Sequence, residues 1–461
     1  MGVGNGNLIF LGAPNFVEAQ WESKITSSTT AGDRIWDRLQ PDNHELLSDV
    51  GRSTSIKISD AKIEVDFGRR RPISGVALVG ANLRRGDHFR IRAGITPLPD
   101  RVEVVPNALV EATGFSSPAL GDLVQDPQDS GDTSWLTPAG NVDTSLRVGF
   151  GLPIPGPVRE GVGLQTVLVR LRESKSVVPW DDQYRISLWE NGALVRQGDL
   201  QALSTSATTG NFDTVVKFHF DAAELADNSG SGVEIRVEGF RQSSPLSEID
   251  VAAIRWYAAL ATQGHLYDSQ QLPAFPDLPG DLWTAADEEE FNGTQLLHHV
   301  FTDASGAIQT VEAQYLRIDL ETVANPDGYF EAGALVAGPA LQAAVNFAPN
   351  ATLSSTDHSE TVEMKGGGQL SVQRRRQRSF SFSLGAYDRA QLLASFFRRI
   401  ELSRGETRPV VVIPVPDDPA VTEAAAMLAR VRGRGIRLQK GILASTGGAV
   451  AGASYECEEV V

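Results

Sequence analysis

Cysteine, long apolar runs and a targeting signal are almost or wholly missing from this sequence of 461 residues. The single cysteine, Cys457, excludes a disulfide within the chain and a metal site built on several thiolates. No apolar run approaches the ~20 residues that a membrane-spanning helix needs. The first residues, Met1 to Gly6, lack the basic region and apolar core of a secretory signal. We therefore expect synthesis in a reducing cytosol and no membrane insertion.

Positive charge and catalytic motifs are also scarce. The chain has 58 Asp and Glu against 41 Lys and Arg, a formal net charge of −17. Nucleic-acid-binding proteins usually carry a basic face, so no nucleic-acid partner is expected. None of the seven histidines has His-Glu-x-x-His spacing, and no nucleophile elbow or phosphate-binding loop occurs. The sequence thus predicts a protein that is not an enzyme, with no catalytic residue, cofactor or metal.

Two groups of carboxylates resemble a metal site or a catalytic pair. The acidic run Asp287 to Glu290 offers oxygen ligands of the kind that Ca²⁺ prefers, but a solvated acidic loop is the favoured interpretation. Asp417 and Asp418 resemble the paired carboxylates of a glycosidase. Neighbouring residues of a strand point apart, however, and the flanking prolines indicate a turn.

Short alternating segments dominate what is present. Lys62 to Gly68 and Phe89 to Ala93 alternate apolar and polar residues, which predicts half-buried strands. In the segment from Tyr184 to Val195, the pair Asn191-Gly192 separates two such runs and predicts a hairpin. Asn325 to Gly328 is a dense turn signal between two further strands. These patterns predict a mainly β fold.

The spacing of the strands predicts three domains. About eight strands within residues 100–260 suffice for a complete jelly-roll β-sandwich. Residues 1–99 supply only part of a sandwich and 261–345 can complete it, so we expect 100–260 to be inserted into a discontinuous first domain. Residues 346–461 differ and predict a small α+β domain. Its expected elements are a helix over 388–400, a buried strand over 410–413, a short helix over 422–430 and a strand over 455–461.

Two resemblances extend this interpretation. The segment from Trp36 through Ile63–Gly68 to Val76–Leu78 and Asn82 resembles the middle of a discoidin-like jelly roll. Residues 262–461, extending to 1–99, resemble structural proteins from siphophage and prophage tails. That resemblance rests on Tyr-x-Arg-Ile-x-Leu from Tyr315, Asn-Pro-Asp-Gly-Tyr-Phe-Glu-Ala-Gly from Asn325, an Arg-rich strand, an apolar helix and Arg-Pro-Val-Val-Val-Ile from Arg408. The sequence departs from the tail-protein pattern at Ala334 and Ala337, and the resemblance does not cover residues 100–260.

The second resemblance implies a virion protein of the distal tail or tail tip, made in the bacterial cytoplasm. It implies a homo-oligomeric ring, a hexamer or a trimer, that contacts tube, hub and fibre proteins. The run Arg374, Arg375, Arg376 and Arg378 then becomes the candidate subunit interface, because partner salt bridges suit an acidic protein better than nucleic acid does.

The alternative function is a carbohydrate-binding host-adhesion module of a virion or a cell surface. Its candidate contacts to a host surface glycan are loop residues of the insertion, namely Trp135, Trp180, Asp181 and Asp182. Trp189 and Trp256 lie in predicted strands and are expected in the core. A third reading, a glycan-degrading enzyme, lacks a convergent acid and base.

Overall fold

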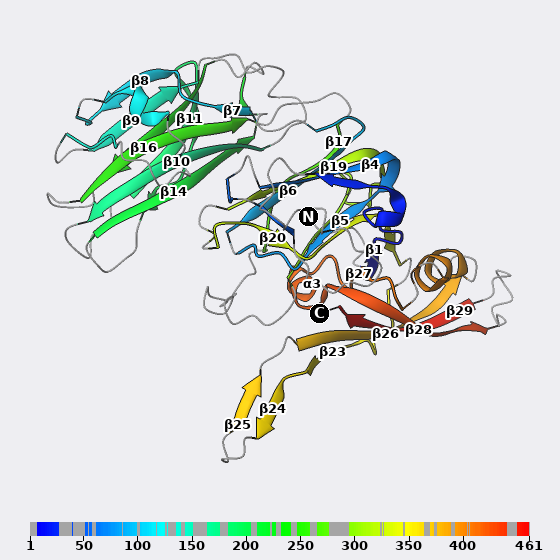
Figure 1. The fold of residues 1–461 in the computed structure, drawn as a ribbon. Coiled ribbons are helices and arrows are strands. Elements are labelled where there is room, and N and C mark those ends of the chain that lie inside the picture. Colours follow the sequence, from blue (N-terminus) through cyan, green and yellow to red (C-terminus); the bar gives the residue numbers. More distant parts are fainter. Residues whose placement is uncertain are drawn as a thin grey trace. The chain divides into compact units, whose positions relative to one another are not determined.

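The structure is a computed structural model, and it divides the chain into two compact units. Unit 1 joins Met1–Leu98 to Gly264–Val461, and unit 2 is the intervening Pro99–Gln263. Both units consist mainly of antiparallel β-strands, so the predicted mainly β class is confirmed (Figure 1). The structure describes residues 7–460 except for 27–38, 40–50, 54, 58–60, 85, 99–101, 117, 125–126, 128–134, 140–142, 151–163, 176–182, 204–209, 222–223, 227–231, 241–246, 259–264, 276–294, 323–324, 326, 344–345, 364–368, 373–375, 389–391, 403, 405 and 440–449.

Unit 1 contains a sandwich of two sheets, which we call the outer sheet and the middle sheet. The outer sheet has five strands in the order β17 (His265–Pro273), β6 (His88–Gly94), β19 (Val311–Glu321), β4 (Lys62–Ile73) and β2 (Lys24–Thr26). The middle sheet has three strands in the order β18 (Leu296–Val300), β5 (Gly75–Val79) and β21 (Ala334–Gly338). A short pair, β3 (Gly51–Arg52) with β20 (Glu331–Ala332), lies beside them.

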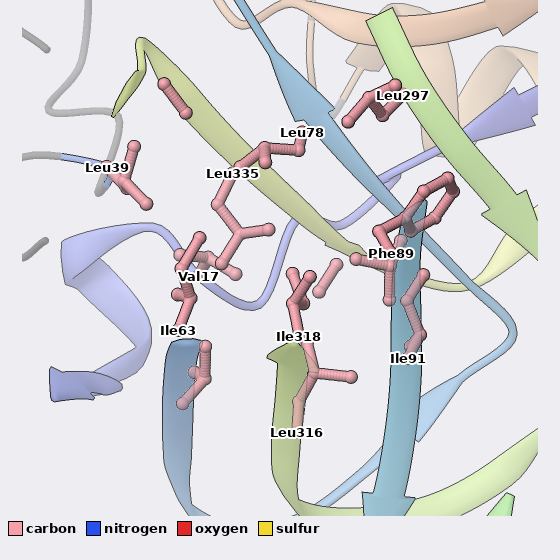
Figure 2. Close-up of a cluster of buried hydrophobic side chains, with 14 of the residues drawn as sticks. Val17, Leu39, Ile63, Leu78, Phe89, Ile91, Leu297, Leu316, Ile318 and Leu335 are labelled. Carbon is pink, nitrogen blue, oxygen red and sulfur yellow. The ribbon is translucent and has the colours of Figure 1, made fainter. Parts of the chain in front are cut away.

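Alternate residues of these strands fill the space between the two sheets. Figure 2 shows Ile63, Phe89 and Ile318 from the outer sheet approaching Leu78 and Leu335 from the middle sheet. This arrangement follows from the two-residue period of a strand, which sends successive side chains to opposite faces.

A third layer, which we call the large sheet, covers the other face of the middle sheet. Its seven strands run in the order β22 (Ala340–Gln342), β1 (Ile9–Leu11), β27 (Val410–Ile413), β28 (Met427–Gln439), β29 (Val450–Glu459), β26 (Arg376–Asp388) and β23 (Thr352–Asp357). Apolar side chains of β1, β5, β21 and β27 form the core between the middle and large sheets. Because these four strands are buried on both faces, their sequences are continuous apolar runs rather than alternating ones.

The composition of the large sheet corrects the predicted division between residues 1–99 and 346–461. Strand β1 comes from the N-terminus, yet Phe10 pairs with Leu341 of β22 on one side and with Val412 of β27 on the other. Residues 346–461 therefore do not form a sheet by themselves. The sequence shows that β1 is apolar but not which strands it joins, because its partners are more than 300 residues away.

The far face of the outer sheet carries buried ion pairs rather than solvated charges. Arg317 donates to Asp319 at 2.7 Å and to Glu64 at 3.1 Å, and Arg92 donates to the same Asp319 at 2.8 Å. The side chains of Arg317, Asp319 and Arg92 are at most 4% exposed. Burial of a charge is costly unless it is paired, so these ion pairs, two of which join neighbouring strands, are what allow this face to be buried.

The turn expected at Asn325 to Gly328 is present, and Asn82 holds it. The Asn325 side-chain oxygen accepts from the Asp327 backbone at 2.9 Å, and Gly328 has φ of +72°. The Asn82 amide donates to Asp327 at 3.0 Å, while its oxygen accepts from the Glu331 backbone at 2.8 Å. The turn is therefore a structural clamp at one end of the sandwich.

The helices of the C-terminal segment differ from their predicted bounds. Strand β26 continues to Asp388, which pairs with Val450, so helix η5 spans only Leu392–Leu402. Phe396 and Ile400 of η5 enter the core as expected. Helix α3 spans Pro419–Ala425 rather than 422–430, because the Asp418 carboxylate caps it by accepting from the Val421 backbone at 3.1 Å. Strand β28 then starts at Met427, which pairs with Val412.

Unit 2 consists of two antiparallel sheets around one core. One sheet has four strands in the order β14 (Gly210–Asp221), β10 (Leu164–Lys175), β16 (Ser247–Ala258) and β7 (Val102–Val104). The other has six strands: β12 (Ala193–Gln197), β11 (Gln183–Glu190), β15 (Val233–Phe240), β9 (Thr144–Gly149) and β8 (Ala108–Thr113), with β13 (Gln201–Ala202) beside β11.

Two local predictions about unit 2 are confirmed. Asn191 and Gly192 form the turn between β11 and β12 with φ of 49° and 78°, as a type I′ hairpin requires. Trp256 is fully buried, and its ring contacts Phe150 and Phe220.

The close approach of the layers in unit 1 predicts that Gly338→Ala destabilises the protein. An alanine Cβ at this position would lie 2.2 Å from the backbone oxygen of Pro14, which cannot swing aside. We expect a loss of about 1–3 kcal/mol in the free energy of unfolding, measured by urea denaturation. Gly121→Ala is the control, because no atom lies within 4 Å of its added Cβ. Equal urea midpoints for the two variants would contradict this packing.

Candidate functional site

The clearest unfinished feature of unit 1 is the edge of the large sheet at β23. Among the described strands it pairs with β26 alone, from Thr352 opposite Ser381 to Asp357 opposite Arg376. All six of its residues are exposed, and Leu353 is 45% exposed. An exposed edge of this kind presents unused backbone donors and acceptors to any strand that can lie beside it.

A hairpin continues from the same pair of strands. Strands β24 (Glu360–Glu363) and β25 (Gln369–Val372) pair with each other and with no other strand that the structure describes. The hairpin extends beyond the end of β23 and β26 (Figure 1). Two-stranded hairpins are marginally stable in water without packing, so this one is a candidate for contacts outside the chain.

Of the arginines predicted at a subunit interface, Arg376 and Arg378 are described, and they lie at the start of β26 in different surroundings. Arg378 donates from Nε to Glu459 at 3.0 Å and from Nη2 to the same carboxylate at 2.6 Å. Its Nη1 donates to the backbone oxygen of Ala424 at 2.9 Å. Arg378 therefore joins β26 to the end of β29 within the chain.

Arg376 is the exposed member of the run. Its side chain is 64% exposed and lies 3.7 Å from Asp357. Arg374 and Arg375 lie outside the described residues. The interface role of the run remains a prediction, with Arg376 as its accessible residue among those described.

The glycan prediction concerns unit 2, where Trp135 is half-buried beside two arginines. The guanidinium carbon of Arg172 lies 4.3 Å from the Trp135 ring centroid and that of Arg170 lies at 5.5 Å. Arg172 donates from Nε to Asp250 at 2.8 Å, and Arg170 donates from Nη2 to Asp213 at 2.6 Å. Burial raises the pKa of the Asp250 carboxyl, although Arg172 acts in the opposite direction. The ring thus packs against guanidinium groups that two carboxylates hold in place.

The other predicted glycan contacts, Trp180, Asp181 and Asp182, lie outside the described residues. Trp189 was expected in the core and is not part of it. It lies on the opposite face of β11 from the core residue Leu188, with the guanidinium carbons of Arg147 and Arg236 at 5.0 and 5.3 Å from its ring. Both faces of β11 carry at least one apolar residue, so its alternating sequence alone does not show which face points into the core.

Of the two carboxylate groups that resemble catalytic or metal-binding sites, one lies among the described residues. Asp418 caps α3, and the run from Asp287 to Glu290 lies outside the described residues. Within the part of the chain that the structure describes, no three His, Cys, Asp or Glu side chains are grouped as a metal site. No described helix is long and apolar enough to cross a membrane.

The adjacent histidines of β18, His298 and His299, are a titratable feature of unit 1. The Tyr267 hydroxyl of β17 lies 2.6 Å from Nε2 of His299, and the Tyr267 ring stacks on Phe301 at 3.9 Å. Burial lowers the pKa of His298 to about 4. Burial, helped by the neighbouring His298, does the same for His299. Both imidazoles are therefore neutral at pH 7, and His299 shares a hydrogen bond with the Tyr267 hydroxyl.

Comparisons with known proteins leave the family open. No family model and no curated protein matches the chain. Among solved structures, a chitosan-binding module from a chitosanase/glucanase of Paenibacillus sp. IK-5 matches 34% of this chain and 96% of its own, with 13% identity and a TM-score of 0.18.

Two further structures match at a similar level. Allantoicase matches 54% of this chain and 95% of its own, with 8% identity and a TM-score of 0.19. A chain of Broad Bean Stain Virus matches 43% of this chain and 96% of its own, with 12% identity and a TM-score of 0.16. Scores this low carry no argument about the arrangement of the chain or its function.

The histidine pair predicts an acid-sensitive fold. Unfolded histidines titrate near pH 6.5, so between pH 6.5 and 4 the unfolded chain binds more protons than the folded one, and stability falls as the pH falls. We expect acidification from pH 7 to 4.5 to lower the free energy of unfolding by about 2 kcal/mol through the two histidines, after allowance for solvent screening.

Urea titrations at the two pH values measure this effect. The double variant His298→Gln with His299→Gln should lose less stability on acidification than the unaltered protein. His358→Gln is the control, since His358 is exposed. An acid response that is unchanged in the double variant would contradict the assignment.

Proposed function

We propose that the chain is a structural component of a bacteriophage tail, at the tail tip or baseplate. In this proposal it forms a symmetric oligomer that links the tail tube to the hub or fibres, and it is a virion protein rather than an enzyme. The resemblance of residues 262–461 and 1–99 to tail proteins suggests the setting. The observation that carries the proposal is the open edge at β23 with its projecting hairpin.

The physical argument is that these elements are costly in an isolated monomer. An unprotected edge strand invites association with further strands, and natural proteins usually shorten, charge or cover such edges. Among the described residues, β23 is exposed along its whole length and has one charged residue, Asp357, at its end. A protein that is permanently part of an assembly can keep such an edge, because a neighbouring subunit covers it.

Electron microscopy and native mass spectrometry of the purified protein test this proposal. We expect closed particles that contain a fixed number of copies, because a tail ring is a closed symmetric assembly. Their mass should stay the same on moderate dilution, since permanent assemblies bury large interfaces. A protein that remains a monomer at high concentration would overturn the ring.

A second candidate function is carbohydrate binding by unit 2, and the half-buried ring of Trp135 favours it. Sugars pack on aromatic rings and are oriented by planar polar groups, which Arg172 and Asp213 supply nearby. On a phage tail, this unit would add recognition of a host surface glycan. The two functions are compatible.

Trp135→Ala is predicted to weaken binding to lipopolysaccharide or capsular polysaccharide by up to about tenfold, because one stacked ring contributes ~0.5–1.5 kcal/mol. Calorimetric titration with each purified polysaccharide measures the effect. The matched control is Trp189→Ala, which also removes a ring that two arginines flank. Equal affinities for Trp135→Ala and the unaltered protein would exclude Trp135 from the site.

A further inference from the structure

We propose that β25 of one copy adds as an extra strand to β23 of the next copy, so that the subunits are joined head to tail. This inference rests on the proposed oligomeric role and names the elements that make the contact. It is argued from the strands of unit 1 alone.

The acceptor is β23, because it is the edge of the large sheet that remains open. The opposite edge, β22, is already occupied: the Ala340 backbone donates to the Ser74 hydroxyl at 2.6 Å. The Ser74 backbone in turn donates to the oxygen of Gly338 at 3.0 Å. The outward backbone N–H of Ala340 in β22 is thus used within the chain, which favours β23 as the acceptor.

The donor is the hairpin of β24 and β25, which needs a third strand. Its two strands pair through Glu360 with Val372 and Glu363 with Gln369. Strands with a third neighbour are far more stable than isolated two-stranded hairpins. Each copy thus carries one open edge and one hairpin that lacks a neighbour among the described strands.

Charge selects β25 rather than β24 as the strand that docks. Strand β24 has two glutamates, Glu360 and Glu363, whereas β25 has no charged residue. Strand β23 ends in Asp357, so β24 would bring like charges together across the new ladder, which is unfavourable. Docking of β25 avoids that repulsion and covers the exposed Leu353.

The geometry is heterologous, because the donor and the acceptor are different strands. Each copy gives one strand and takes one, and such contacts close into a ring when the rotation between copies allows it. The competing arrangement pairs β23 with β23 of a second copy about a two-fold axis. That arrangement stops at two copies and leaves β25 unused.

Cysteine cross-linking distinguishes these arrangements. The native Cys457 is fully buried and burial raises the pKa of its thiol, so it does not interfere. In the full-length protein, Ser354→Cys is combined in turn with Gln369→Cys, Leu370→Cys, Ser371→Cys and Val372→Cys, and mild oxidation is followed by non-reducing electrophoresis. We expect at least one pair to give a ladder of species larger than a dimer. Ser354→Cys with Thr361→Cys, which places the second thiol in β24, is the matched control and should not do so.

The other outcomes are equally informative. A dimer formed by Ser354→Cys or Ser355→Cys alone would show two-fold pairing of β23 and overturn the proposal. An oligomer seen by native mass spectrometry without any cross-link in the series would overturn it while leaving the proposed function intact. A protein that is monomeric throughout would overturn both.

A substitution on the edge supplies an independent readout. Leu353→Lys places a charge on an exposed position of β23 and should keep the fold, which circular dichroism checks. We expect it to weaken oligomer formation by tenfold or more, because a lysine on an edge strand opposes strand addition. Unchanged assembly of this variant would overturn the proposed contact.

Discussion

The middle sheet of unit 1 is buried on both faces, and this constraint decides much of the rest. Its strands β5 and β21 are apolar throughout, and the layers approach closely enough that Gly75 and Gly338 have no room for a Cβ. The layer that covers it takes β1 from one end of the chain and β27 from the other. Unit 1 therefore cannot complete its core until nearly all of the chain has been made, which predicts slow folding dominated by long-range contacts.

The sequence predicted those features that are encoded locally. Val410–Ile413 is a buried strand because four successive apolar residues suit burial on both faces, and Asn191-Gly192 is a hairpin turn because both residues tolerate positive φ. Features that depend on distant partners could not be predicted. The alternation around Arg317 indicates a strand, but only the fold shows that its charged face is buried and paired with Asp319 and Glu64.

The candidate assembly surface was the hardest part to predict, for a physical reason. Sequence patterns report burial, and β23 is a strand that buries nothing, with the polar sequence Thr-Leu-Ser-Ser-Thr-Asp. The run of arginines beside β23 is easy to see in the sequence, but it shows only where positive charge is concentrated and not what that charge does. Arg378 finds its carboxylate in Glu459 because β29 lies next to β26, a pairing across about 80 residues that no local pattern encodes.

The chain leaves the outer sheet after Gly94 and returns at His265, and these two residues face each other on paired strands. Neighbouring strands are about 4.8 Å apart, so the chain enters and leaves unit 2 from two adjacent positions of the outer sheet. Any polypeptide whose ends can meet at that spacing can replace it without moving either strand. Genetic recombination at these two points would thus exchange unit 2 for another domain while the paired strands of unit 1 stay the same.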